Sequence, residues 1–376
     1  MIYLVLSTIK MKKHTNQYSI DDIVLFRNSN NQLTIGKITY QTSNHTYLLQ
    51  EQHRIIKIPT ASIVNTSPIF NPIYTTQASN HLKLIKKIHQ KFTAQNIPYV
   101  FIKSLPTYQY LYNTFPKRLM ADIDILISPS HKSQALTILQ TLNYYPSPHT
   151  PPHTSQYHCF NSSEAFPYTI DLHLQPAISF TQFPLLSKLI SNQNLTRYFL
   201  THTKLISLPN DIRVPILQPK AMLILLSLHF FHHHFQGYHR LKLLADLSKD
   251  TNLDWNRFLK DVKHLQLDNI VYFSLLITNH LYPNRYINQY LPHFNVNQTT
   301  LIISKLFTRL PTTFFLSRYD NNNPLKKLLL SIIVSPYPLT QQLKLIFNYN
   351  NLKHITQTLN YKHKSHSNFP IIKFLW

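Results

Sequence analysis

The sequence predicts an α+β fold, in which a small mixed β-sheet with helices lies between an N-terminal β-rich module and a C-terminal helical domain. Three observations indicate this fold. Residues 21–66 contain short apolar segments separated by polar turns, a helical apolar period begins at residue 79, and the pattern beyond residue 181 is almost wholly helical. A chain of 376 residues with 43% hydrophobic content is long enough for more than one core. We therefore divide it into residues 1–70, 79–180 and 181–376.

The N-terminal module is predicted from four β-type segments that Asn, Ser and Gln turns separate: residues 23–26, 33–40, 47–49 and 54–58. A small β-barrel or β-rich module fits this spacing, and we interpret it as structural.

The central domain alternates helical and extended patterns. Leu82, Ile85, Ile88 and Phe92 recur on one face of a helix. The elements predicted after the break at Pro98 are a strand at 99–102, a Tyr-rich helix from Pro106, a strand from Asp122, a helix at 130–142, a Pro/His-rich loop at 143–158 and a strand at Asp171. This order predicts a small mixed sheet.

The C-terminal domain is predicted from helical segments at residues 220–235, 241–247, 255–265, 270–281 and 298–360, packed beside the sheet. The first segment carries His229, His232 and His233 at i, i+3 and i+4, a spacing that can bind zinc. No Glu of a His-Glu-x-x-His motif accompanies them, so packing or a place at the rim of a substrate site is the alternative. Arg240 and Asp246 fit helix packing and ion pairing.

The most informative segment is Asp122-Ile-Asp124-Ile-Leu-Ile127, which follows Arg118. Residues two apart on a strand share a face, so the two carboxylates lie side by side while the isoleucines are buried on the other face. Asp171 offers a third carboxylate if its strand is a neighbour of the first. Three acids on adjacent strands suit a hard divalent cation and indicate metal-assisted phosphoryl or nucleotidyl transfer. A solvated strand edge is the plainer interpretation of Asp-x-Asp alone.

With these motifs, the chain resembles a family of uncharacterised bacterial nucleotidyltransferases with a DNA-polymerase-β-like fold. The Leu-Lys-Gly, Arg-x-x-x-Asp-Ile-Asp and Asp-Leu-His segments of that family correspond to Ile102-Lys103-Ser104, Arg118 to Ile127 and Asp171-Leu172-His173. Its helical part has Leu-His, Arg-Leu-x-x-x-x-Asp and Asp-Trp segments, which correspond to Leu228-His229, Arg240 to Asp246 and Asp254-Trp255. The resemblance covers roughly residues 80–350 and leaves the N-terminal module outside.

The resemblance implies a nucleotidyltransferase core at residues 79–180 that transfers a nucleoside monophosphate from a nucleoside triphosphate, ATP first among the candidates, to an unknown hydroxyl-type acceptor. Asp122, Asp124 and Asp171 would bind two Mg²⁺ ions, and Asp171 would also orient or activate the acceptor. Lys103, Ser104 and Arg118 would bind the nucleotide phosphates. The further candidates for substrate contact or for orienting these groups are His173, His229 and Arg240.

Ser104 departs from the family, which has Gly there and so lets the backbone approach the phosphates closely. Either the serine is tolerated or phosphate binding is impaired. The alternative function is therefore a catalytically degenerate protein that binds nucleotide or RNA through the same site and a basic surface.

The formal net charge is +23, which favours an anionic partner such as nucleic acid, nucleotide or a membrane surface. Residues with guanine-rich codons, including Gly, Glu, Trp and Cys, are scarce, so a guanine-poor gene explains the same basicity. With this second explanation available, the net charge is compatible with a nucleic-acid partner but is not by itself evidence for one. The basic segments at residues 326–334 and 362–376 leave a similar choice between contact with an anion and packing of a terminal helix.

The single Cys159 excludes an intramolecular disulfide. The N-terminal apolar run precedes its lysines, which reverses the order of a secretory signal. The longest apolar run, at residues 221–231, is shorter than the ~20 residues that span a bilayer. We expect a cytoplasmic protein without a transmembrane segment.

Overall fold

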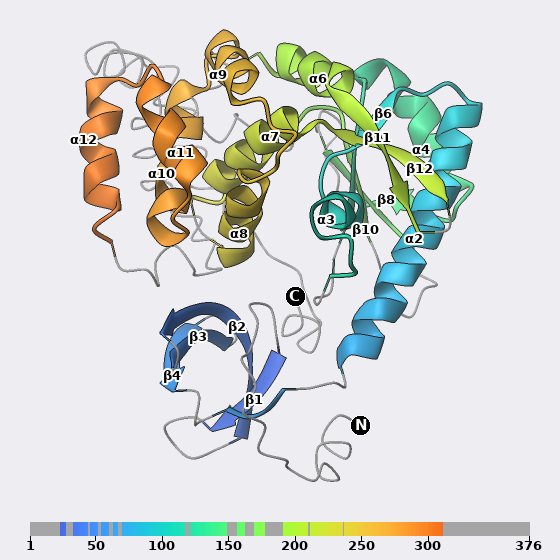
Figure 1. The fold of residues 1–376 in the computed structure, drawn as a ribbon. Helices are drawn as coiled ribbons and strands as arrows, with labels where there is room; N and C mark the ends of the chain where they lie inside the picture. Colours follow the sequence, from blue (N-terminus) through green and yellow to red (C-terminus); the bar gives the residue numbers. More distant parts are fainter. Residues whose placement is uncertain are drawn as a thin grey trace.

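The computed structural model describes residues 23–27, 33–43, 46–51, 54–59, 63–66, 70–116, 120, 122–148, 156–161, 169–176, 191–209, 211–235 and 237–310. Within these ranges the chain forms two β-sheets and a set of helices, so the predicted α+β class with a mixed central sheet is confirmed (Figure 1). The expectations for Arg118, for helices beyond residue 310 and for the two basic C-terminal segments lie outside the described residues.

A seven-stranded mixed sheet forms the centre of the molecule. Its strands are β6 (Tyr99–Phe101), β7 (Asp122–Ile127), β8 (Tyr145–Pro146), β9 (Gln156–Phe160), β10 (Thr169–His173), β11 (Thr203–Leu208) and β12 (Ile212–Leu217). They stand in the order β11-β12-β6-β7-β10-β9-β8. β7 runs parallel to β10 and antiparallel to β6, and every residue of β7 after Asp122 is buried, as expected for a central strand.

Two expectations about this sheet are wrong. Residues 143–158 are not only loop, because they contain β8 and begin β9, in which buried Tyr157 and Cys159 alternate with polar residues. Residues 203–217 are not helical, because they form the β11–β12 hairpin, and β12 pairs with β6. Pro215 and the left-handed backbone of Asp211 suit a hairpin better than a helix.

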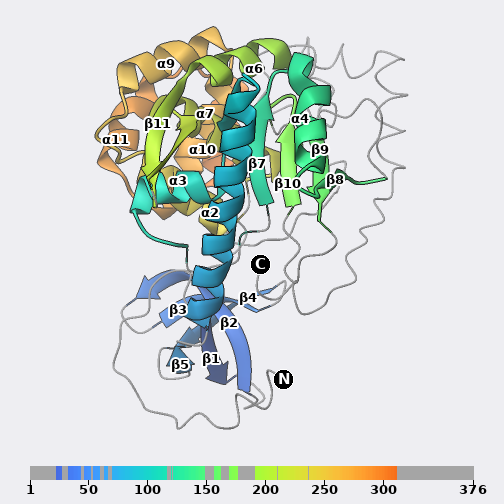
Figure 2. The same ribbon diagram turned by 90° about the vertical axis from the view of Figure 1, so that its right-hand side faces the viewer.

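The helices that accompany the sheet are α2 (Phe70–Ala94), α3 (Ser104–Tyr112), α4 (Lys132–Gln140) and α6 (Asn192–Thr201), with a 3-10 turn at Pro129–His131. α2 begins at Phe70 rather than at residue 79, and its four predicted core residues are buried. α2 and α4 lie on the side of the sheet away from the helical domain (Figures 1 and 2). Gln77 of α2 fixes the chain before β7, since its side-chain amide donates to Met120 O (2.9 Å) and accepts from Met120 N (2.8 Å).

The C-terminal helices, which are called the helical domain below, share one hydrophobic core with the central sheet. They are arranged around α7 (Pro219–His232), which is apolar on all sides and buried along most of its length. The other members are α8 (Tyr238–Leu247), α9 (Trp255–His264), α10 (Asp268–Leu281), α11 (Arg285–Tyr290), α12 (Gln298–Phe307) and a 3-10 turn at Leu291–His293. Asp254 caps α9 by accepting from Arg257 N at 3.0 Å, and buried Trp255 stacks on Tyr290. The Asp-Trp segment therefore serves capping and packing. No helix in the described ranges is long and apolar enough to cross a bilayer.

The N-terminal module is a five-stranded antiparallel sheet. Its strands are β1 (Ile23–Arg27), β2 (Leu33–Ser43), β3 (Thr46–Glu51), β4 (Arg54–Pro59) and β5 (Ile63–Thr66), in the order β4-β3-β2-β1-β5. They enclose a separate small core that includes Phe26 and Tyr47. The module contacts the helical domain through Tyr40, whose hydroxyl donates to Leu281 O at 3.2 Å and whose ring meets Tyr282 edge-on.

Two tyrosines of α3 join the central sheet to the helical domain. Tyr112 donates a hydrogen bond to Asp246 Oδ2 at 2.6 Å, and Tyr110 donates one to Asp250. Lys242 adds an ion pair with Asp246 at 2.5 Å, which agrees with the ion-pairing role expected for that aspartate. Because α3 begins at Ser104, these bonds fix the helical domain relative to the loop at Lys103.

We expect Tyr110→Phe and Tyr112→Phe each to lower the free energy of unfolding by about 1–3 kcal/mol, since each removes a hydrogen bond to a carboxylate. Urea denaturation of both variants measures this. Tyr145→Phe is the matched control, because Tyr145 is 54% exposed and should change stability by less than about 0.5 kcal/mol. If Tyr110→Phe and Tyr112→Phe lower the free energy of unfolding no more than Tyr145→Phe does, the hydrogen bonds between α3 and the helical domain add nothing to stability.

Candidate active site

The three predicted acids lie on two adjacent parallel strands. In the pairing of β7 with β10, Asp171 stands directly opposite Asp124, and Thr169 stands opposite Asp122. Residues two apart on a strand share a face, so all three carboxylates project from the same side of the sheet. The sequence interpretation required these strands to be neighbours, and they are.

Asp124 is the most closely surrounded of these carboxylates, with only 3% of its side chain exposed. Its Oδ1 accepts from Lys103 Nζ at 2.8 Å and from His173 Nε2 at 2.9 Å. Its Oδ2 accepts from the Ser104 hydroxyl at 3.0 Å. One buried carboxylate thus joins the loop after β6, strand β7 and strand β10.

The charges of Asp124 and Lys103 stabilise each other. Burial alone would raise the pKa of Asp124, but the Lys103 ammonium and His173 hold this pKa well below its usual range. Burial alone would lower the pKa of Lys103, but the carboxylates of Asp124 and Asp122 raise it above its usual value. Both groups are therefore charged at neutral pH.

Asp171 is held by two residues that the sequence interpretation missed. Gln156 Nε2 donates to Asp171 Oδ2 at 2.9 Å, and His158 Nδ1 lies 2.7 Å from Asp171 Oδ1. The hydrogen bond to Asp171 outweighs burial and raises the pKa of His158. Both residues come from β9, in a segment that the sequence predicts to be loop. The alternation of Gln156 and His158 with Tyr157 and Cys159 was the signal that could have revealed them.

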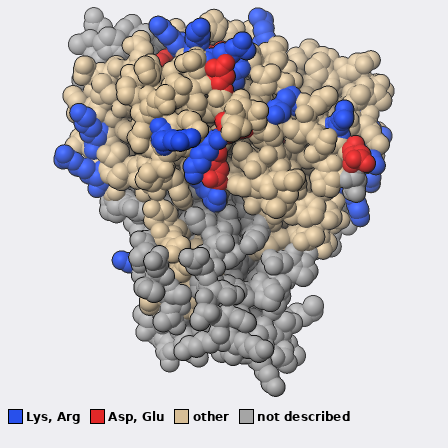
Figure 3. Space-filling view, viewed as in Figure 1, with Lys and Arg blue, Asp and Glu red and all other residues tan. Residues whose placement is uncertain are grey.

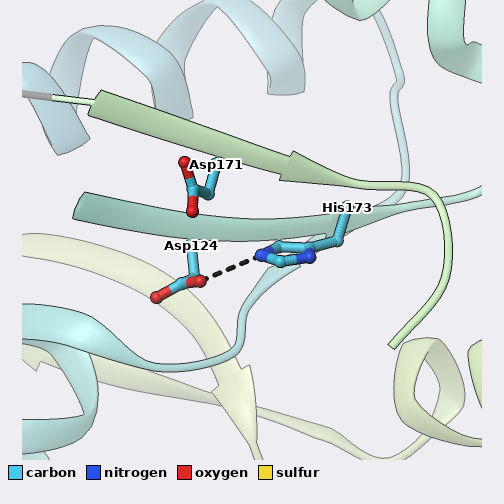
Figure 4. A group of neighbouring side chains, drawn as sticks. All are labelled: Asp124, Asp171 and His173. Atoms are coloured by element: carbon cyan, nitrogen blue, oxygen red, sulfur yellow. Dashed lines mark hydrogen bonds and ion pairs between the residues drawn. The ribbon is translucent and has the colours of Figure 1, made fainter. Parts of the chain in front are cut away.

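Asp124, Asp171 and His173 form a group that can hold a metal ion. Each offers one ligand atom, and these atoms all lie within 4.8 Å of one another. Figure 4 shows the His173 imidazole pointing at the Asp124 carboxylate, with Asp171 beside them. Two carboxylates suit Mg²⁺ or Mn²⁺, and an imidazole is a donor that transition metals accept. The donor set fits a divalent cation, and half-buried Asp122 lies on the same face of β7 as a further carboxylate.

The charge of Lys103 reaches one further predicted residue, His229 of α7. Burial, and then the positive charge of Lys103, hold the pKa of His229 well below its usual value, and Arg240 from the first turn of α8 acts on the same imidazole. Arg118 itself lies outside the described residues, whereas Met120 is fixed by Gln77. Lys103, Ser104, Asp124, Asp171 and His173 thus form the inner group, and Arg240 lies against the turn at Gly237.

Ser104 has a backbone φ of 70°, in the left-handed region that favours glycine. This explains physically why the family has Gly at this position. The serine side chain also contributes, because its hydroxyl donates to the Asp124 carboxylate and accepts from Asp124 N at 3.2 Å. The strain of an L-residue is therefore offset by hydrogen bonds that glycine cannot make.

We expect Ser104→Gly to change the free energy of unfolding by less than about 1 kcal/mol, because lost strain and lost hydrogen bonds offset each other. Ser104→Ala keeps the strain and loses the bonds, so it should destabilise by about 1–3 kcal/mol. Chemical denaturation gives both values. At Ser133, exposed in the first turn of α4, the order should be the usual one, with Ala more stable than Gly. The same order at Ser104 would contradict this account.

One comparison with known proteins agrees with the motifs. A family model described as an uncharacterised nucleotidyltransferase matches residues 73–283, which is more than half of the chain. No curated protein matches the sequence. The solution structure of the antibiotic-resistance factor ANT(2'')-Ia is similar at 12% identity and a TM-score of 0.33, over 52% of this chain and 96% of that chain. A likeness at this level supports no statement about activity. The extent of the family match shows that the chain belongs to the family of uncharacterised nucleotidyltransferases.

Proposed function

We propose that the protein is a Mg²⁺-dependent nucleotidyltransferase that moves a nucleoside monophosphate from a nucleoside triphosphate, ATP in the first instance, onto a hydroxyl-type acceptor. The observation that carries the proposal is the register of β7 and β10. It sets Asp124 beside Asp171, with Asp122 on the same face. Lys103, from the loop after β6, lies 2.8 Å from Asp124. Membership of the family supports nucleotidyl transfer in general.

In the proposed reaction, the acceptor oxygen attacks the α-phosphorus, the bond from that phosphorus to the pyrophosphate oxygen breaks, and pyrophosphate leaves with the electron pair. Asp122, Asp124 and Asp171 would hold divalent cations, which when bound neutralise charge on the reacting phosphates. Asp171 would accept the proton of the acceptor hydroxyl. Gln156 and His158 would keep its carboxylate aimed at that hydroxyl.

Lys103 would supply positive charge to the site. Its ammonium neutralises Asp124, and it precedes α3 as the N-cap residue. The same ammonium would help to neutralise the negative charge of the nucleotide phosphates.

A catalytically silent protein that holds nucleotide or RNA is the second candidate function. One observation favours it: both oxygens of Asp124 are already engaged by protein groups, including the Ser104 hydroxyl at the family's glycine position. RNA is the less favoured ligand on the face drawn in Figure 3, where the basic side chains of the described residues form several separate groups with acidic side chains near the centre. A polyanion track would need a continuous basic stripe.

We expect Asp124→Asn to lower the affinity for ATP with magnesium by at least about tenfold and to abolish pyrophosphate release, because it removes a cation ligand and leaves Lys103 unpaired. Asp171→Asn removes both a cation ligand and the proton acceptor, so it should weaken magnesium-dependent ATP binding and lose about 100-fold in pyrophosphate release with hydroxyl acceptors. Calorimetry and a pyrophosphate assay measure the two effects.

Asp211→Asn is the matched control, since Asp211 is an exposed aspartate at the β11–β12 turn. Equal magnesium-dependent ATP binding by wild type, Asp124→Asn and Asp211→Asn would show that the site is wrongly assigned. Salt-sensitive binding that survives in Asp124→Asn, with no pyrophosphate release from wild type, would favour the silent binding protein.

A further inference from the structure

A histidine stands next to the carboxylates of the candidate site. His173 follows Asp171 by two residues on β10, so both side chains project from the face of the sheet that carries Asp124. His173 Nε2 lies 2.9 Å from Asp124 Oδ1, and one ligand atom from each of the three residues lies within 4.8 Å of the others (Figure 4). Ligand atoms of one octahedral cation, each about 2.1 Å from the metal, lie about 3 Å apart when adjacent and about 4 Å apart when opposite. The spacing therefore suits three ligands of a single ion.

Hydrogen bonding within the protein does not account fully for this histidine. His173 is 1% exposed, and its second nitrogen, Nδ1, has no hydrogen-bond partner among the described residues. A buried polar atom without a partner costs about 1–3 kcal/mol. A histidine that only held Asp124 in place would be more stable with both nitrogens satisfied. The unpartnered nitrogen thus points to a ligand of the imidazole other than a protein group.

The imidazole distinguishes one class of divalent cation from another. Mg²⁺ binds oxygen ligands and retains several of its waters, whereas first-row transition cations also take imidazole nitrogen. Lys103, whose ammonium lies 2.8 Å from Asp124 Oδ1, repels any divalent cation to a similar extent because the charges are equal. The lysine therefore lowers the affinity for Mg²⁺ and Mn²⁺ alike, and the histidine sets the ratio between them.

The histidines of α7 do not offer a comparable site. In the described part of the chain, the group whose ligand atoms all lie within 4.8 Å is Asp124, Asp171 and His173, and the three histidines of α7 do not form another. The zinc interpretation of their i, i+3, i+4 spacing is therefore not supported.

We infer that His173 is a metal ligand, and that the buried position it forms with Asp124 and Asp171 selects Mn²⁺ or another first-row transition cation over Mg²⁺. This inference rests on the proposed function, in which the aspartates hold cations. Half-buried Asp122 is outside the group of three, so it is left to the second cation, the Mg²⁺ that is bound mainly by the triphosphate. His173 would then determine which metal occupies the inner position.

The first test measures binding of Mn²⁺ and of Mg²⁺ without nucleotide, by calorimetry. Wild type should bind Mn²⁺ at least about tenfold more tightly than Mg²⁺, and His173→Asn should bring the two affinities within about threefold, because it removes the nitrogen ligand. His264→Asn is the matched control and should keep the wild-type ratio, since His264 is exposed on α9. A wild-type protein that binds no Mn²⁺, or binds both ions equally, would overturn the inference.

The second test identifies the ligand directly by pulsed EPR of bound Mn²⁺. Wild type should show the nitrogen hyperfine coupling of a coordinated imidazole, and His173→Asn should lose it. His158→Asn should keep the coupling, because His158 contacts Asp171 but is outside the group of three. Absence of the coupling from wild type, or its loss in His158→Asn and not in His173→Asn, would show that His173 is not the ligand.

Circular dichroism checks that the variants fold. If His173→Asn does not fold, the wild-type affinity ratio and the nitrogen coupling of wild type and His158→Asn decide the outcome. The inference and the proposed function fail separately. Pyrophosphate release with Mg²⁺ and no nitrogen coupling to Mn²⁺ overturns only the inference. Nitrogen coupling that depends on His173, with no pyrophosphate release from wild type with either metal, supports the metal site and overturns the proposed chemistry.

Discussion

The buried ion pair between Lys103 and Asp124 is the interaction on which the rest of the structure depends. Its charges come from two segments, the loop after β6 and strand β7, and the two groups lie 2.8 Å apart. Leaving one such buried charge unpaired costs about 3–5 kcal/mol. Ser104 and His173 saturate the same carboxylate, so the pair also sets the positions of α3 and β10. The hydrogen bonds of Tyr110 and Tyr112 in turn fix the helical domain relative to α3.

The sequence predicted the structure correctly where a single periodicity of apolar residues describes a whole segment. The buried faces of α2 and β7 follow from spacing alone, and so do the general positions of α7 to α10. The prediction was wrong where short strands interrupt a segment that otherwise has a helical pattern. The β11–β12 hairpin follows helix α6 directly, and the turn residues Pro209-Asn210-Asp211 and Pro215 were the sequence signals that mark it. The helices predicted beyond residue 310 are still predictions.

The inner group was predictable because carboxylates two apart on a strand must share a face. What alternation could not supply was the pairing of β7 with β10, which depends on contacts between distant segments. His158 and Gln156 were missed for the same reason, because only the pairing of β9 with β10 brings their side chains to Asp171. Ser104 could be read as a loss of glycine, but its hydrogen bonds to Asp124 are visible only in three dimensions.

The strand order has a consequence for how the protein is made. β6 lies inside the finished sheet, flanked by β7 on one side and by β12 on the other. β12 ends at Leu217, so a chain emerging from the ribosome carries β6 with one open edge while all of β7 to β10 is already available. An open apolar edge invites pairing with other chains. From synthesis of β7 until closure of the hairpin, the edge of β6 that later pairs with β12 is therefore open to such pairing.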